Sequence, residues 1–191
     1  MYNLSKELRE ELEQNILPFW MNRMIDQRNG GFLGRIDGCG NLVPNAEKGA
    51  ILNARILWAF AAAYRVLHKP EYLDAATRAK DYFINHFIDV QEGGVFWSLD
   101  AQGNVLDAKK QTYAIGFAIY GLSEYARATG DKEALLHAKK LYTDIERHAF
   151  DSVNNGYVEA LTRDWQPIAD MRLSDKDENG SRTMNTHLHI L

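Results

Sequence analysis

The sequence predicts an all-α fold, an α/α toroid to which this chain contributes about three helical hairpins with short β-hairpins between them. One segment occurs three times, as GGFLGRIDGCGNLV (30–43), GGVFWSLDAQGNVL (93–106) and, less closely, NGYVEALTRDWQPI (155–168). The copies are 62 or 63 residues apart, measured between Gly31, Gly94 and Gly156. Helices that are apolar on nearly every side alternate with helices that are apolar on one side. Since such a repeat cannot bury its apolar faces alone, we expect consecutive repeats to stack.

The first repeat opens with an amphipathic helix. Ser5 is expected to cap it, and its apolar stripe is formed by Leu8, Leu12, Ile16 and Trp20. A hairpin follows and turns at residues 38–41. The next helix, over about 48–67, is apolar on nearly every side, as expected of a helix buried on several faces. Pro70 then opens a one-sided helix, because proline is tolerated in a first turn.

The second and third repeats follow the same order. A hairpin turns at residues 100–103, and an apolar helix over 112–128 ends before Gly130, which has the position of a C′ glycine. A one-sided helix starts at Asp131. After the third hairpin, residues 169–183 are polar and loop-like, and a last helix starts near residue 182. We therefore predict an inner ring of helices that begin near residues 48, 109 and 182.

Composition excludes several classes of protein. Apolar residues make up 46% of the 191 residues, which indicates a globular core, and the net charge is −4. There is no basic stripe for nucleic acid, and no apolar run reaches the roughly 18 residues that a membrane-spanning helix needs. The N-terminal helix is charged and does not resemble a signal peptide. With Cys39 as the single cysteine, the cytoplasm is the expected location.

The chain stops within the last helix, without a helix-ending signal. A closed ring of this type commonly has six hairpins, of which the sequence supplies three. Residues 1–191 are therefore expected to be the N-terminal half of a single α/α-barrel domain, and the C-terminal half of the barrel is an expected partner. By itself, the 191-residue chain is expected to be inactive.

Three stretches resemble a known family: NARILWAF (53–60), QTYAIGFAIYGL (111–122) and LSDKDENGSRTMNTHLHIL (173–191). They are similar to the N-acylglucosamine 2-epimerase superfamily, and within it most similar to cellobiose 2-epimerases, including the mannobiose-converting members. The resemblance covers the whole chain but only the first half of a family member. It implies an (α/α)6 barrel and an isomerase that inverts C2 of the reducing-end sugar of a β-1,4-linked disaccharide of the cellobiose, mannobiose or lactose type.

This reaction proceeds through an enediolate. A base removes the C2 proton, and an acid returns it to the opposite face. Histidines suit both steps because their pKa lies near neutrality, and the developing oxyanion needs cationic or hydrogen-bonding groups. No cofactor is required. The family carries two further proton-transfer histidines in its C-terminal half, outside this chain.

Two apolar helices carry candidate site residues. Arg55 is costly to bury without a partner, so from the sequence alone it pairs with a structural carboxylate, lies at the helix edge or serves the site. The resemblance implies that it is catalytic and binds the C1 and C2 oxygens. Tyr113 begins the second apolar helix, and the resemblance assigns it to substrate binding. Phe117 lies one turn later on the same face, either as an apolar wall for the sugar or as core.

The last helix carries Asn185, His187 and His189. Positions 185 and 189 share a helix face, whereas 187 points elsewhere. The resemblance implies that Asn185 binds substrate and that His189 is catalytic, whereas His187 is interpreted as a packing residue. A His-x-His pair on a helix diverges, and no carboxylate stands at ligand spacing, so no metal site is expected.

Several alternatives remain open on the sequence. Relatives within the superfamily act on N-acylglucosamine or interconvert aldoses and ketoses. A glycoside hydrolase on the same toroid would need a pair of carboxylic acids, for which Glu159, Asp164 and Asp175 are candidates only by their position in loops. A non-catalytic toroidal fragment is the third alternative.

Overall fold

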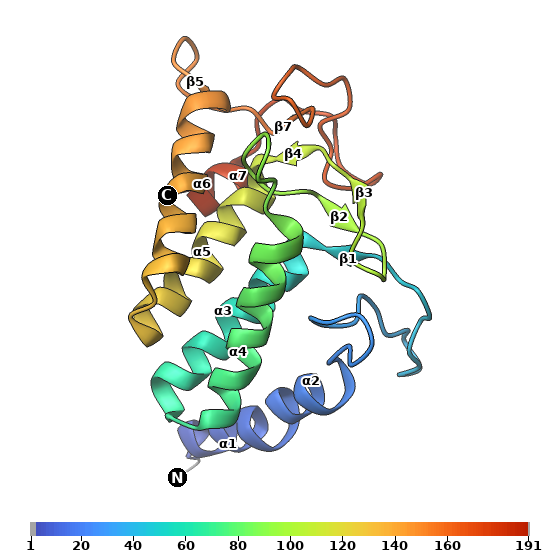
Figure 1. Ribbon diagram of the computed structural model, residues 1–191, viewed down its shortest axis with the longest axis vertical. Coiled ribbons are helices and arrows are strands. Elements are labelled where there is room, and N and C mark those ends of the chain that lie inside the picture. Colours follow the sequence, from blue (N-terminus) through green and yellow to red (C-terminus); the bar gives the residue numbers. More distant parts are fainter. Residues whose placement is uncertain (1–2, 191) are drawn as a thin grey trace.

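The computed structural model describes residues 3–190, which form half of an α/α toroid (Figure 1). The inner helices are α3 (Ala50–Leu67), α5 (Thr112–Thr129) and α7 (Met184–Ile190). The outer helices are α1 (Leu4–Glu11), α2 (Leu17–Arg23), α4 (Pro70–Tyr82) and α6 (Lys132–His148). Two π-helical turns, η1 (Leu12–Ile16) and η2 (Phe83–Phe87), join α1 to α2 and extend α4. The predicted alternation of buried and one-sided helices is confirmed.

Short antiparallel strands gather at one end of the helices (Figure 1). The strands are β1 (Lys48–Gly49), β2 (Ser98–Leu99), β3 (Val105–Asp107), β4 (Lys110–Gln111), β5 (Phe150–Asp151), β6 (Gly156–Tyr157) and β7 (Ala160–Leu161). They pair in the orders β1-β2-β3, β4-β7 and β5-β6. The strand before α3 thus pairs with the hairpin of the second repeat, and the strand before α5 with that of the third. This pairing links each repeat to the next at the mouth of the ring.

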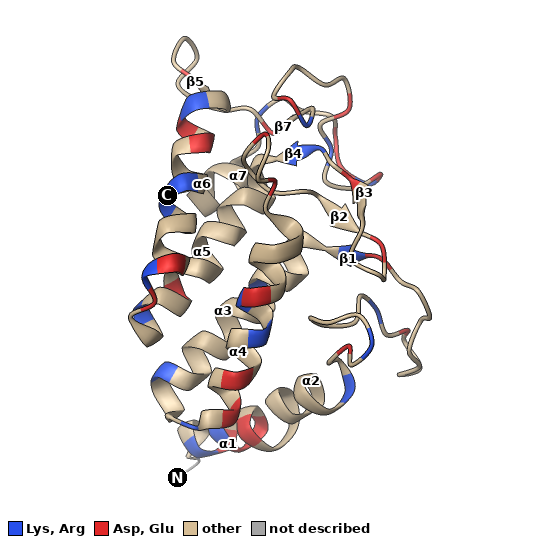
Figure 2. Cartoon of the chain, in the orientation of Figure 1, with Lys and Arg blue, Asp and Glu red and all other residues tan. Residues whose placement is uncertain are grey.

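The core lies between α3 and α5. Ala54 and Leu57 on α3 and Ala118 and Leu122 on α5 are fully buried. A Cβ built on Gly121 would lie 2.7 Å from the carbonyl oxygen of Ala54, so only glycine allows this close approach of the two helices. By contrast, acidic and basic residues follow one another along the outer helix α4 (Figure 2).

Two expectations for the helices need correction. The first helix begins at Leu4, and its cap is Asn3, whose side-chain oxygen accepts the Lys6 N–H at 3.3 Å; Ser5 is already helical. Also, α3 is long and apolar enough to cross a membrane by length and composition alone, contrary to expectation. Its packing against α4 and α5 accounts for this composition, because a core helix is apolar on several sides.

A cation–carboxylate pair recurs in each repeat. Asp26 and Asp89 cap the turns before the first two hairpins. Asp26 accepts a hydrogen bond from the ammonium of buried Lys48 at 2.8 Å, and Asp89 accepts one from buried Lys110 at 2.8 Å. In the third repeat Asp151 pairs with Arg182. Each cation lies two residues before an inner helix. The pairs therefore fix the start of each inner helix against the preceding turn.

Candidate active site

A cavity of about 730 Å³ opens between the three inner helices. Its lining residues come from α3, α5 and α7, and they are Arg55, Trp58, Ala59, Gly116, Phe117, Tyr120, Leu188 and His189. The volume lies within the range of small-molecule sites, and the walls are mostly aromatic and aliphatic, as is usual for such sites. The cavity brings together three of the five residues expected in the site, namely Arg55, Phe117 and His189.

Arg55 lies in the second turn of α3 with an exposed side chain. Its guanidinium carbon is 4.9 Å from the centre of the Phe117 ring. Within residues 3–190 it forms no ion pair, so the structural carboxylate that the sequence left open is not found there. An aromatic face attracts a cation but leaves the five N–H donors of the guanidinium free for a ligand.

His189 lies against two aromatic rings of α5. The centre of its imidazole is 4.9 Å from the centre of Tyr113 and 4.7 Å from that of Phe117. Phe117 therefore stands between Arg55 and His189. A Cβ on Gly116 would lie 3.1 Å from the carbonyl oxygen of His189, so this glycine lets α7 approach α5 closely. Tyr113 reaches the site through this contact and does not line the cavity itself.

The hydrogen bonds of the two histidines on α7 define their tautomers. Nδ1 of His189 lies 2.9 Å from the carbonyl oxygen of Asn185. Because a carbonyl oxygen only accepts, Nδ1 donates this bond, which favours the tautomer in which Nε2 can accept a hydrogen bond or a proton. In His187, Nδ1 donates to the carbonyl of Thr183 at 2.6 Å, and Nε2 accepts the Tyr157 N–H at 2.9 Å. As predicted, His187 points away from the cavity.

Asn185 lies apart from the cavity. Its exposed side chain lines a separate hollow of about 220 Å³ between the first turn of α7 and the loop over 169–183. Asn185 and His189 are one turn apart on the same face of α7, as expected, but they do not line the same cavity. The 169–183 loop encloses the first turn of α7, so that Asn185 and His189 line two separate hollows. The acids Asp177 and Glu178 line this hollow together with Arg172.

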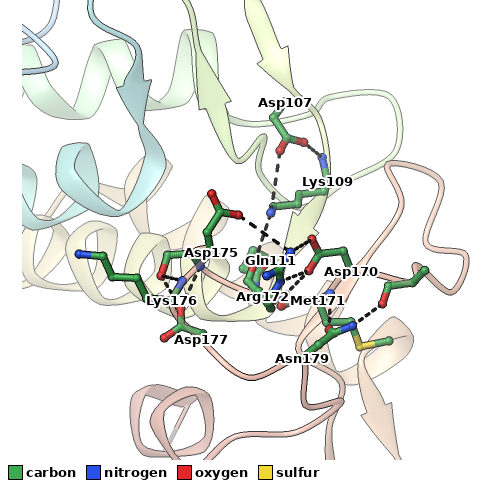
Figure 3. A network of polar contacts seen from close by, with 12 residues as sticks. Asp107, Lys109, Gln111, Asp170, Met171, Arg172, Asp175, Lys176, Asp177 and Asn179 are labelled. Atoms are coloured by element: carbon green, nitrogen blue, oxygen red, sulfur yellow. Dashed lines mark hydrogen bonds and ion pairs between the residues drawn. The ribbon is translucent and has the colours of Figure 1, made fainter.

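Hydrogen bonds and ion pairs hold the 169–183 loop together and attach it to β4 (Figure 3). The side-chain amide of Gln111 donates to the carbonyl of Met171 at 3.0 Å, and Arg172 binds both carboxylate oxygens of Asp170 at 2.8 Å. The side chain of Asn179 closes the loop by accepting the Met171 N–H and donating to the Ala169 carbonyl. The loop predicted to be merely polar is therefore anchored next to the start of α5.

Two aromatic residues of the cavity wall were not assigned to the site from the sequence. The rings of Trp58 and Tyr120 stack at 4.9 Å. Burial raises the pKa of Tyr120, as does Glu124, and nearby Arg55 acts in the opposite direction. Trp58 follows Arg55 by three residues, and Tyr120 follows Phe117 by three. Residues three apart share a helix face, so this spacing from Arg55 and Phe117 could have indicated that Trp58 and Tyr120 also face the cavity.

The carboxylates considered for a hydrolase do not face one another across the cavity. None of its lining residues in the described part of the chain is acidic. Both carboxylate oxygens of Glu159 bind to protein donors, and Asp164 accepts the hydroxyl of Thr162 at 2.5 Å. Asp175 is exposed beside Arg172, at 3.9 Å. Among residues 3–190, no group of three or more His, Cys, Asp or Glu side chains could hold a metal ion.

The fold defines this chain as half of an α/α toroid, with a cavity on the inner side of the ring whose size and lining suit a small molecule. The family model of the N-acylglucosamine 2-epimerases matches residues 31–176. The chain belongs to this family.

Its relatives include enzymes that act on disaccharides. Over 188 residues it is 63% identical to a cellobiose 2-epimerase of Bacteroides fragilis, covering 98% of this chain and 48% of that protein. The structure of cellobiose 2-epimerase from Bacillus thermoamylovorans superposes with a TM-score of 0.94 at 42% identity, covering 100% of this chain and 49% of that one. A D-mannose isomerase superposes with a TM-score of 0.81 at 25% identity, over 97% of this chain and 45% of that one. The chain thus spans about half the length of the relatives it matches.

Proposed function

We propose that the full-length protein is a carbohydrate 2-epimerase that inverts C2 of the reducing-end sugar of a β-1,4-linked disaccharide. The observation that carries this proposal is a guanidinium and an imidazole, from Arg55 and His189, that line one cavity with aromatic walls. The similarity of nearly the whole chain to a cellobiose 2-epimerase supports the choice of substrate class.

The reaction conserves all atoms. After ring opening, the C1 aldehyde acidifies the C2 proton. A base removes this proton to give an enediolate, and an acid delivers a proton to the opposite face of C2, so only the configuration changes. A fixed cation next to the developing oxyanion lowers the barrier, because it needs little reorganisation during the reaction.

Each cavity residue has a proposed role. Arg55 binds the C1 and C2 oxygens with its planar fork of donors. His189, with its proton on Nδ1, presents Nε2 to the same oxygens and helps to move a proton between them during ring opening. Phe117 forms an apolar surface for the sugar, Tyr113 contributes to substrate binding by packing against Phe117 and His189, and Asn185 binds substrate from the separate hollow at the first turn of α7. The two proton-transfer histidines are expected, by family resemblance, in the remainder of the protein.

The organisation of the whole protein is part of the proposal. Residues 1–191 are the N-terminal half of a single α/α-barrel domain, and the other half closes the site. The protein acts on free sugars in the cytoplasm, as part of carbohydrate metabolism.

A second candidate function is aldose–ketose isomerisation, which the similarity to a D-mannose isomerase favours. It uses the same enediolate and returns the proton to C1 instead of C2. Epimerisation of N-acylglucosamine is the other activity within the family.

Product analysis in heavy water tests the proposal. The full-length protein is incubated with cellobiose, and the products are followed by NMR. An epimerase forms the C2 epimer and incorporates deuterium at C2. A ketose product would establish the isomerase, and released monosaccharide would establish a hydrolase. Recovery of unchanged, unlabelled cellobiose would contradict the proposed substrate.

A further inference from the structure

Glu159 is a buried carboxylate that holds the start of α7. Glu159 directly precedes β7 in the sequence and is 1% exposed. Oε1 accepts the backbone N–H of Thr183 at 2.6 Å, and Oε2 accepts the hydroxyl of Thr186 at 2.6 Å. Thr186 is fully buried. Both oxygens therefore bind the first turn of the helix that carries His189.

The backbone of Glu159 binds the neighbouring segments. Its carbonyl oxygen accepts the Thr112 N–H, the first of α5, at 2.9 Å, and its own N–H donates to the carbonyl of Ser181 at 3.0 Å. One residue is thus hydrogen-bonded to the starts of two adjacent inner helices. Of these two helices, α5 carries Tyr113 and Phe117, and α7 carries Asn185 and His189.

We propose that Glu159 is a positioning residue for the epimerase site, which fixes the orientation of α7 and so the place of Asn185 and His189. This inference rests on the proposed function. His189 is three residues beyond Thr186, less than one helical turn, so a shift of the first turn moves its imidazole relative to Phe117 and Arg55. A misplacement of about 1 Å costs roughly 100-fold in rate.

A carboxylate suits this position better than its amide. Both of its contacts on α7 come from donors, an N–H and an O–H, and a carboxylate offers two acceptor oxygens. Glutamine offers one acceptor for the Thr183 N–H, and its NH2 group would force the Thr186 hydroxyl to accept instead of donate, so both bonds to a charged acceptor are lost. The bonds to a charged acceptor are also stronger than those to a neutral one.

Two substitution pairs in the full-length protein test the inference. Thr186→Val removes the hydroxyl at nearly constant volume, whereas Thr186→Ser retains it. Glu159→Gln is matched by Glu124→Gln, at a buried glutamate near the C-terminal end of α5 that pairs with Arg65 at 2.5 Å and with Arg127 at 3.7 Å. For each variant, kcat and KM for cellobiose, the melting temperature and the hydrogen exchange of peptides over 183–190 are measured.

We expect Glu159→Gln and Thr186→Val to lower kcat at least 10-fold more than they raise KM, and to increase exchange over 183–190. Thr186→Ser should restore kcat to within threefold of the wild type, and Glu124→Gln should lower only the melting temperature. If Glu159→Gln and Thr186→Val behave like Glu124→Gln, the inference is overturned. If the wild type does not turn over cellobiose, the proposed function fails. In that case, unchanged exchange over 183–190 in Glu159→Gln would also refute the positioning role, and faster exchange would support it.

Discussion

Arg55 lies in the cavity with an aromatic ring on one side and no carboxylate bound to it in the described part of the chain. Arg55→Ala in the full-length protein should lower kcat about 100- to 1,000-fold, because one oxyanion partner contributes roughly 3–4 kcal/mol to transition-state stabilisation. Arg55→Lys should also be slow, since a point charge cannot bridge two oxygens as the planar fork does. Steady-state kinetics and melting temperatures check this. A lysine variant with wild-type kcat would show that Arg55 is peripheral.

The two histidines of α7 make a matched pair. His189→Ala should lose most of kcat with little change in melting temperature, because the imidazole lies in the cavity. His187→Ala should keep kcat but lower the free energy of unfolding by about 1–3 kcal/mol, since it leaves the Tyr157 N–H without its acceptor. Kinetics and thermal unfolding of both variants separate the two roles. An active but destabilised His189→Ala protein would refute the proposed role of His189.

At the scale of single residues, the sequence predicts those side-chain orientations that helical spacing determines. The divergence of His187 from His189 follows from the angle between successive residues of a helix, and it was predicted correctly. The separate hollow of Asn185 was not predicted, because it depends on where the 169–183 loop folds back. Trp58 and Tyr120 were missed although each lies three residues beyond a candidate, because an aromatic residue on an apolar helix fits that spacing whether it faces the core or the cavity.

Elements were predicted more completely than their ends. The apolar helices over 48–67 and 112–128 correspond to α3 and α5, because a helix buried on several faces has a distinctive composition. The hairpin turns at 38–41 and 100–103 are also confirmed, by hydrogen bonds from Asp37 to Asn41 and from Asp100 to Asn104. The two π-helical turns leave no such pattern. Asn3, not Ser5, caps the first helix. Both residue types are suitable caps, and two such residues so close together cannot be ranked from sequence alone.

The contact between α3 and α5 depends on a residue without a side chain. Gly121→Ala should lower the free energy of unfolding by about 1–3 kcal/mol, because its Cβ would meet the Ala54 carbonyl at 2.7 Å and force the helices apart. Gly38→Ala is the control, since no atom lies within 4 Å of its Cβ position. Denaturant unfolding of both variants of the full-length protein measures the difference. Equal stability of the two would show that the helices absorb the extra carbon without cost.

At the scale of the whole molecule, the buried ion pairs make stability depend on pH. Burial opposes the ionisation of Asp89, but hydrogen bonds from Arg163 and Lys110 outweigh it and hold its pKa below the ordinary value. The stability that Asp89 contributes is therefore complete above about pH 4 and is lost as the pH falls further. Asp89→Asn should cost about 3–5 kcal/mol at pH 7, because Lys110 is left buried without its partner.

Urea unfolding of the full-length protein at pH 7, 4 and 3 checks this dependence. The difference between wild type and Asp89→Asn should narrow below pH 4. Glu10→Gln, which removes an exposed pair with Lys6, serves as the control and should change little at any of these pH values. A gap that stays constant down to pH 3 would be inconsistent with an ionised Asp89 in the folded state.

The isolated 191-residue chain is expected to lack epimerase activity. It does not carry the two proton-transfer histidines that the family resemblance places elsewhere. A second, apolar groove of about 560 Å³ between the first helices and α3, lined in part by Leu12, Trp20, Ile56 and Val66, should also promote self-association. Activity assays combined with light scattering test both points. Turnover of cellobiose by a verified monomer would disprove the expectation.

The recurring cation–carboxylate pairs also bear on the order of folding. The first two pairs join residues only 22 and 21 positions apart, and the third joins residues 31 apart. Short separations are closed at low entropic cost, and folding rates rise as contacts become more local. Each junction of turn and inner helix can therefore assemble as its own repeat emerges from the ribosome, before the partner segments across the ring have been synthesised. The repeats would then pack against one another with these junctions of turn and inner helix already formed.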